Sequence, residues 1–134
     1  MDFDLAVALE AVASRKLDRF TPAWKPGASV CVVMAAGGYP DSPETGKAIG
    51  GIEDAAALPD VTVFQAGTKR EGDSIVTSGG RVLGVTAAAE SLPLAIQKVY
   101  EATGKIHFDG AQFRSDIGAK GDLRKSVAAE APRG

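Results

Sequence analysis

The sequence predicts an α+β domain in which an antiparallel β-sheet of about four strands is covered by one helix. In the segment 61–87, runs rich in Val, Ile, Thr and Phe alternate with two glycine turns, a pattern typical of a β-meander. Residues 28–36 are continuously apolar and predict a strand buried on both faces. Residues 91–103 carry apolar side chains at helical spacing and predict the covering helix. We expect the strand 28–36 and the meander to share one sheet.

Composition limits the classes of protein and site. A chain of 134 residues with 45% hydrophobic residues is long enough for one domain with a core. The net charge is −2 and the basic residues are scattered, which argues against a nucleic-acid surface. With one cysteine and one histidine, an internal disulfide is excluded and no metal site is expected. No signal peptide or membrane-length apolar run occurs, so we expect a cytoplasmic protein without membrane contact.

The chain divides into four predicted segments. Residues 1–17 form an amphipathic helix, 18–27 a linker with prolines, 28–118 the β-rich domain and 119–134 a flexible tail. The first helix begins almost at residue 1 with no strand before it, which is a first hint that an N-terminal part is missing.

Two elements of the β-rich domain have further expected features. The strand 80–87 carries no charge on either face and should be central in the sheet. Gly104 should end the covering helix, which Ser91 caps, and the segment 106–118 should return along the sheet.

The second glycine turn is the candidate anion site. Ser78, Gly79 and Gly80 precede Arg81, so backbone N–H groups can approach an anion that the guanidinium grips with two hydrogen bonds. Lys69 beside the first turn is the second candidate, because the strand between the turns spans roughly 13 Å and one phosphosugar reaches both ends only if the hairpin bends. The alternative is two solvated surface cations.

The loop Gly37, Gly38, Tyr39, Pro40 is the other candidate. Two glycines after a strand form either a plain turn or a site where the backbone contacts a ligand. The spacing of the glycines in this loop does not match the nucleotide phosphate-loop motif GxxxxGK(S/T). The sequence contains few candidate catalytic residues. The single histidine, His107, lies between apolar neighbours and is interpreted as a structural residue, and no Ser-His-Asp triad can be assembled. We therefore expect no catalytic residue in this chain.

Five motifs resemble one family. VVMAAGGYP, VFQAGTK, TSGGRVLGVTA, SLPLAIQKVYEATGKI and IHFDGAQFRSDIG occur in the order typical of the C-terminal domain of phosphoribosylamine–glycine ligases, from about residue 28 to 118. The helix FDLAVALEAVASRKLD is similar to the segment that closes the ATP-grasp domain of that family. The resemblance implies the family's C-terminal fold, a rudimentary barrel-sandwich-like domain, and makes residues 1–17 a remnant of the ATP-grasp domain.

The resemblance also implies an activity. The family joins glycine to 5-phosphoribosylamine with ATP and Mg²⁺ or Mn²⁺ in purine biosynthesis and forms glycinamide ribonucleotide. By this resemblance Arg81, Lys69, Gly79 and Gly80 meet the ribose 5-phosphate, and the loop 37–40 lines the same cleft. ATP and the metal belong to the complete enzyme and are not expected on this chain alone.

The chain departs from the family pattern in two ways. Asp41, Pro43 and Gln65 stand where the family often has other residues, which weakens the inferred loop contacts. The ATP-grasp motifs and the N-terminal domain are absent, so we expect a C-terminal piece that is inactive alone. The alternative function is a non-catalytic β-rich interaction or oligomerisation module that uses the face of residues 3–16.

Overall fold

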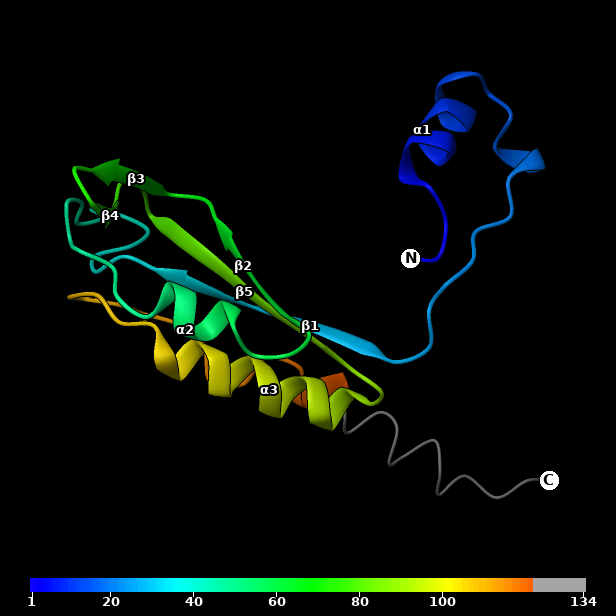
Figure 1. Ribbon diagram of the computed structural model, residues 1–134. Helices are drawn as coiled ribbons and strands as arrows, with labels where there is room; N and C mark the ends of the chain where they lie inside the picture. Colours follow the sequence, from blue (N-terminus) through cyan, green and yellow to red (C-terminus); the bar gives the residue numbers. More distant parts are fainter. Residues whose placement is uncertain (122–134) are drawn as a thin grey trace.

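A three-stranded antiparallel sheet organises the chain (Figure 1). The structure is a computed structural model that describes residues 1–121. The strands β1 (Ala28–Ala35), β5 (Arg81–Ala89) and β2 (Val61–Gln65) lie in the order β1-β5-β2. The central position of β5, predicted from its lack of charge on both faces, is therefore confirmed.

The hairpin of β3 (Thr68–Glu71) and β4 (Ser74–Thr77) forms a separate two-stranded sheet. The prediction that the whole meander joins one sheet was therefore wrong. The N–H groups of Ala66 and Gly67 both donate to the Val82 carbonyl, each at 3.1 Å, so the chain leaves the ladder of β5 at this point. The free edge of β4 pairs instead with the loop at Ala48, through an isolated bridge to Val76.

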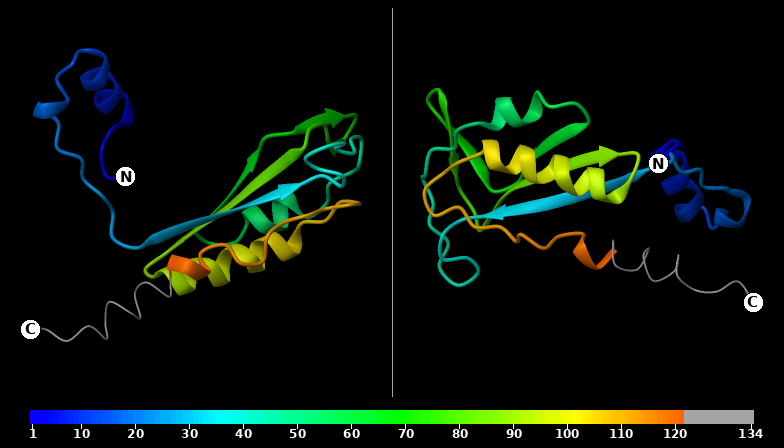
Figure 2. Two further views of the ribbon diagram at one scale, coloured as in Figure 1. Left: turned by 180° about the vertical axis from the view of Figure 1, so that it is seen from behind. Right: turned by 90° about the horizontal axis from the view of Figure 1, so that it is seen from below.

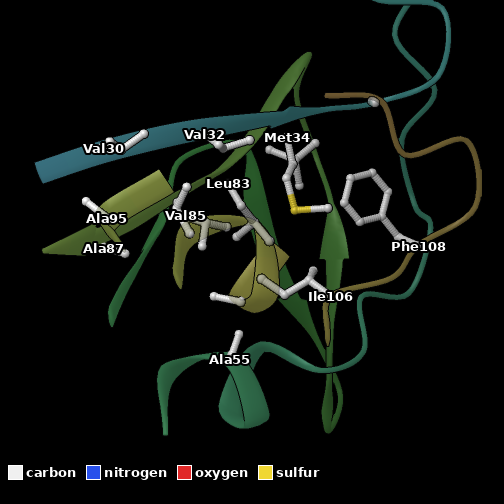
Figure 3. Packing of buried hydrophobic residues seen from close by; sticks show 14 residues of the cluster. Val30, Val32, Met34, Ala55, Leu83, Val85, Ala87, Ala95, Ile106 and Phe108 are labelled. Carbon is white, nitrogen blue, oxygen red and sulfur yellow. The ribbon is translucent and has the colours of Figure 1, made fainter. Parts of the chain in front are cut away.

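Both further helices of the β-rich part cover the same face of the sheet. In Figure 1, α2 (Ile52–Ala56) and α3 (Leu92–Lys105) lie on one side of the three strands. Ala95, Val99 and Ala102 of α3 are fully buried, and the two alanines let the helix approach the sheet closely. Figure 3 shows the core formed with the inner face of β1 and β5, namely Val30, Val32, Met34, Leu83, Val85 and Ala87.

The opposite, outer face of the sheet is open. The β1 residues alternate between buried and exposed, with Cys31 and Val33 on the exposed side. A strand buried on both faces was predicted here, and this was wrong because no second layer covers the outer face within residues 1–121. Val33 and Phe64 both pair with Gly84, so these three residues form a row across the outer face.

The N-terminal part lies apart from the sheet in Figure 1 and in the left view of Figure 2. Helix α1 (Leu5–Ala13) begins at Asp4, whose carboxylate accepts a 2.8 Å hydrogen bond from the Ala6 N–H, and it buries none of its residues. The short η1 (Leu17–Arg19) follows. Among residues 1–121, no helix has the length and apolar character needed to cross a membrane.

The C-terminal segment runs beside β1, as predicted. Gln112 and Ala35 exchange two backbone hydrogen bonds of 2.7 and 2.9 Å. Helix α3 continues to Lys105, so Gly104 lies inside its last turn and does not end it as predicted. Ser91 is the N-cap residue, but its side chain makes no capping hydrogen bond. The predicted flexible tail lies, from residue 122 onward, outside the described residues.

Candidate functional site

Arg81 is the first residue of β5 and pairs with Ala35 of β1, where the register shifts between Met34 and Ala35. Its side chain is exposed. Within residues 1–121 it forms no ion pair, whereas several other cations are held by a carboxylate. The guanidinium is therefore available to an external anion, which it can grip with parallel N–H bonds.

Two adjoining hollows flank Arg81 on the outer face of the sheet. The larger has a volume of about 670 Å³, and the row Val33, Gly84 and Phe64 lies in its wall. Gly84 has no side chain, so the sheet is hollowed between the exposed side chains of Val33 and Phe64. The smaller, of about 450 Å³, also contains Phe113 and Arg114. Val33, Tyr39 and Arg81 line both hollows, so the two form one continuous candidate site.

The backbone beside Arg81 offers two N–H groups. The Ser78 N–H donates to the Gly67 carbonyl at 2.8 Å and is therefore occupied. The N–H groups of Gly79 and Gly80 have no acceptor in the part of the chain that the structure describes, although the Gly80 carbonyl accepts from Ala36 at 2.9 Å. Both glycines are half-buried, and of the two only Gly80 lines a hollow, the larger one.

The loop 37–40 supplies one side chain to the site. A Cβ placed on Gly80 would lie 2.4 Å from Cδ2 of the Tyr39 ring, so this ring covers Gly80. Gly37 packs against Gly110, and Gly38 has φ of 77° in a turn closed by Ser42. The two glycines thus shape the turn, whereas Tyr39 reaches the hollow. Pro40 follows a cis peptide bond and is exposed, and it lines neither hollow.

Lys69 does not lie at the hollows. It pairs with Val76 in the hairpin, and its ammonium group forms a 2.6 Å ion pair with Glu71, two residues along the same strand. It lines neither hollow beside Arg81. The structure therefore brings Arg81, Gly80 and Tyr39 together and leaves Lys69 on the separate two-stranded sheet.

One cation, Lys47, pairs with two nearby carboxylates and offsets part of their negative charge. Lys47 lies 3.4 Å from Glu44 and 3.0 Å from Asp109, and the hydrogen bond with Asp109 is the main reason why the pKa of Lys47 is raised. Glu44 is close to the loop, since its Cδ lies 3.8 Å from a Cβ built on Gly37. Because the carboxylates of Glu44 and Asp109 are paired with Lys47, they compete less with a ligand for the guanidinium of Arg81.

Several lining residues were not predicted as site residues from the sequence. They are Cys31, Val33, Phe64 and Gly84 on the sheet, and Gln112, Phe113 and Arg114 on the C-terminal segment. For the strand residues the only sequence signal was period-two alternation, which does not show which face stays uncovered. Arg114 was interpreted from the sequence as part of a structural network with Asp109 and Asp116, and its pair with Asp116 is present. Within residues 1–121 there is no group of three or more His, Cys, Asp or Glu residues that could hold a metal ion. His107 packs against Gly50 and exchanges backbone hydrogen bonds with it, as a structural residue does.

Comparison with known proteins gives consistent results. Among curated relatives, phosphoribosylamine–glycine ligase of Chlorobaculum tepidum is 50% identical over 117 residues, which cover 87% of this chain and 28% of the relative. The ligase of Pseudomonas aeruginosa is 42% identical over 125 residues, covering 93% of this chain and 29% of the relative. The chain therefore spans less than a third of the length of these relatives.

A solved structure and a family profile agree with these relatives. The crystal structure of phosphoribosylamine–glycine ligase from Thermotoga maritima superposes with a TM-score of 0.64 at 33% identity, covering 81% of this chain and 27% of that chain. Residues 29–120 match the family described as "Phosphoribosylglycinamide synthetase, C domain". This match spans more than half of the sequence and includes β1, β5 and the whole Arg81 site, and the chain belongs to the phosphoribosylglycinamide synthetase C-domain family.

Proposed function

We propose that this chain acts as the phosphosugar-binding C-terminal domain of a phosphoribosylamine–glycine ligase, which joins glycine to 5-phosphoribosylamine with ATP in purine biosynthesis. One observation carries the proposal. Arg81, which forms no ion pair within residues 1–121, directly follows Gly79 and Gly80, whose N–H groups have no acceptor in the same residues, and Gly80 and Arg81 both line the larger open hollow. These donors match a phosphate group in charge and in hydrogen-bonding capacity.

The rest of the site suits a sugar. With the 5-phosphate at Arg81, the ribose would lie over the row Val33, Gly84 and Phe64, with the Tyr39 ring beside it. Apolar and aromatic surface with few polar groups is typical of small-molecule sites. Both 5-phosphoribosylamine and glycinamide ribonucleotide carry the 5-phosphate, so the site would hold substrate and product alike. Lys69 stays outside the proposed contacts because Glu71 holds it on the hairpin.

The nucleotide chemistry is assigned elsewhere in the proposed enzyme. The described residues contain no acidic or histidine cluster for Mg²⁺ or Mn²⁺, so they do not fit a metal–ATP site. In proteins of the relatives' length, the remaining part would bind ATP and the metal, and the present domain would close over the phosphosugar. We therefore derive no phosphoryl-transfer step from this chain.

Titration of the chain with ribose 5-phosphate tests the proposal, with amide NMR signals as the readout. We expect weak binding, with a Kd of about 1 mM, that shifts the signals of Gly79 and Gly80. Arg81→Ala should weaken it about tenfold or more, because the charge-assisted bonds are lost. Arg70→Ala is the matched control, since Arg70 is an exposed arginine on β3 that lines neither hollow. Absence of any shift at residues 79–81, or equal effects of the two substitutions, would overturn the proposal.

The second candidate function is an interaction module that uses α1. Leu5, Val7, Leu9 and Val12 are each about half exposed, from 47% to 59%, and α1 buries no residue. Light scattering separates the two functions. A stable dimer that dissociates on Leu9→Glu and has no affinity for ribose 5-phosphate would favour the module over phosphosugar binding.

A further inference from the structure

Two arginines from distant parts of the sequence line one hollow. Arg81 begins β5, Arg114 belongs to the C-terminal segment beside β1, and both contribute to the smaller hollow of about 450 Å³. We propose that Arg114 is the second cation of the phosphate site, and that together with Arg81 it makes the site select a dianionic phosphomonoester over a singly charged anion. The inference rests on the proposed function.

Backbone pairing places the two arginines at the same hollow. Ala35 pairs with Arg81 of β5 on one side and with Gln112 on the other. The two hydrogen bonds between Ala35 and Gln112 fix the C-terminal segment against the end of β1. Arg114 is two residues after Gln112, so the bridge between Ala35 and Gln112 positions it at the same hollow as Arg81.

The Arg114 segment is held in place by two further groups. The Tyr100 hydroxyl donates to the Arg114 carbonyl at 2.7 Å and accepts from the Ile117 N–H at 3.0 Å. The Asp116 carboxylate accepts from Nε and Nη2 of Arg114 at 2.8 and 2.7 Å. Tyr100 and Asp116 are therefore positioning residues. Asp116 occupies one edge of the guanidinium, and the remaining N–H groups are left for a ligand.

The second arginine, Arg114, makes the affinity depend on the charge of the ligand. A phosphomonoester carries about −1.5 to −2 at pH 7, whereas a sulfate monoester carries a single negative charge. Arg81 alone matches a single charge, and adding Arg114 favours the second charge of the phosphate. Asp116 offsets part of the charge of Arg114, so the expected preference is a moderate factor. Lys69 does not fill this role, since it lies on the hairpin and lines neither hollow.

The test compares ribose 5-phosphate with ribose 5-sulfate on the full chain, followed through the amide signals of Gly79 and Gly80. We expect the native chain to prefer the phosphate by about tenfold. Arg114→Ala should lower this ratio to about two while changing sulfate affinity less than about twofold. Arg114→Lys should restore part of the ratio, because the charge returns but the two hydrogen bonds with which Asp116 holds the guanidinium do not. Arg81→Ala should weaken both ligands. Lys98→Ala is the matched control, since Lys98 is ion-paired with Asp60 at 2.9 Å and lines neither hollow.

The outcomes separate the two proposals. If the native chain binds ribose 5-phosphate and Arg81→Ala weakens this binding about tenfold or more, but Arg114→Ala keeps the full phosphate preference, then Arg114 is not the second cation and the proposed function stands. If the native chain binds neither ligand at residues 79–81, the proposed function fails and this inference falls with it. Loss of preference in Lys98→Ala as well would show that overall charge, and not Arg114, sets the ratio.

Discussion

The ring of Tyr39 covers Gly80 so closely that a Cβ at residue 80 would lie 2.4 Å from ring atom Cδ2. This contact joins the loop after β1 to the turn before β5, two segments about forty residues apart in sequence. This packing brings the Tyr39 ring, Gly80 and Arg81 together at the larger hollow.

A double-mutant cycle on these two residues should show strong coupling. Gly80→Ala is expected to cost about 1–2 kcal/mol of unfolding free energy, because the exposed Tyr39 ring must swing away from the new methyl group. In a Tyr39→Ala background the same change should cost less than about 0.5 kcal/mol. Urea unfolding of the four proteins measures the cycle. Equal costs in both backgrounds would mean that the ring does not cover Gly80 in solution.

Gly84 and Gly67 should respond to alanine in opposite ways. A Cβ on Gly84 would lie 3.5 Å from Cys31 Sγ and 3.8 Å from Phe64 Cβ, which are ordinary van der Waals distances. The free energy of unfolding of Gly84→Ala should therefore be unchanged or higher by up to about 0.5 kcal/mol. It fills the hollow between Val33 and Phe64, so ribose 5-phosphate affinity should fall.

Gly67→Ala provides the contrast. Its Cβ would lie 2.5 Å from the Arg81 carbonyl oxygen and 3.0 Å from Gly79 Cα, and backbone atoms cannot move aside cheaply. We expect a loss of about 2–4 kcal/mol, measured by thermal and urea unfolding. A destabilised Gly84→Ala together with an unaffected Gly67→Ala would contradict the described packing of the outer face.

Thr77→Val should destabilise the junction between β4 and the loop before α2. The buried Thr77 hydroxyl accepts from the Lys47 N–H at 3.1 Å and donates to the Glu44 carbonyl at 3.3 Å. Valine keeps the shape but leaves both backbone groups without this partner, at a cost of about 1–3 kcal/mol. Thr86→Val is the control, because the Thr86 hydroxyl has no hydrogen-bond partner in residues 1–121, and it should change stability by less than about 0.5 kcal/mol. Similar effects of both substitutions would remove the role assigned to Thr77.

Asp116 should have a carboxyl pKa below its ordinary value. The hydrogen bond from Arg114, reinforced by its charge, lowers the pKa of the Asp116 carboxyl below its ordinary value. Because the folded-state pKa is depressed, any stabilisation is present above the unfolded-state pKa and is lost as the pH falls through the folded-state value. Carboxyl ¹³C NMR titration measures this, and Arg114→Ala should return the pKa toward its ordinary value. Lys98→Ala should leave it unchanged, and an identical titration in Arg114→Ala would show that the ion pair does not form.

The sequence by itself determined the class of fold, the central position of β5 and the presence of the covering helix, and it predicts an anion site at the turn before Arg81. These features depend on local patterns: apolar periodicity, uncharged strand faces, and glycines next to a cation. It also contained the ordered motifs that resemble the family to which the chain belongs.

Only the tertiary structure decided which other cation lines a hollow together with Arg81 and which face of the sheet is open. The outer face of β1 has apolar side chains like the inner one, so periodicity could not show that Val33 and Phe64 stay uncovered. The chain leaves the three-stranded sheet at Gly67, so Lys69 lies on the separate hairpin and lines neither hollow beside Arg81. The bridge between Ala35 and Gln112 positions Arg114 at the hollow. Both outcomes depend on hydrogen bonds between residues distant in sequence, and no local pattern encodes such pairings.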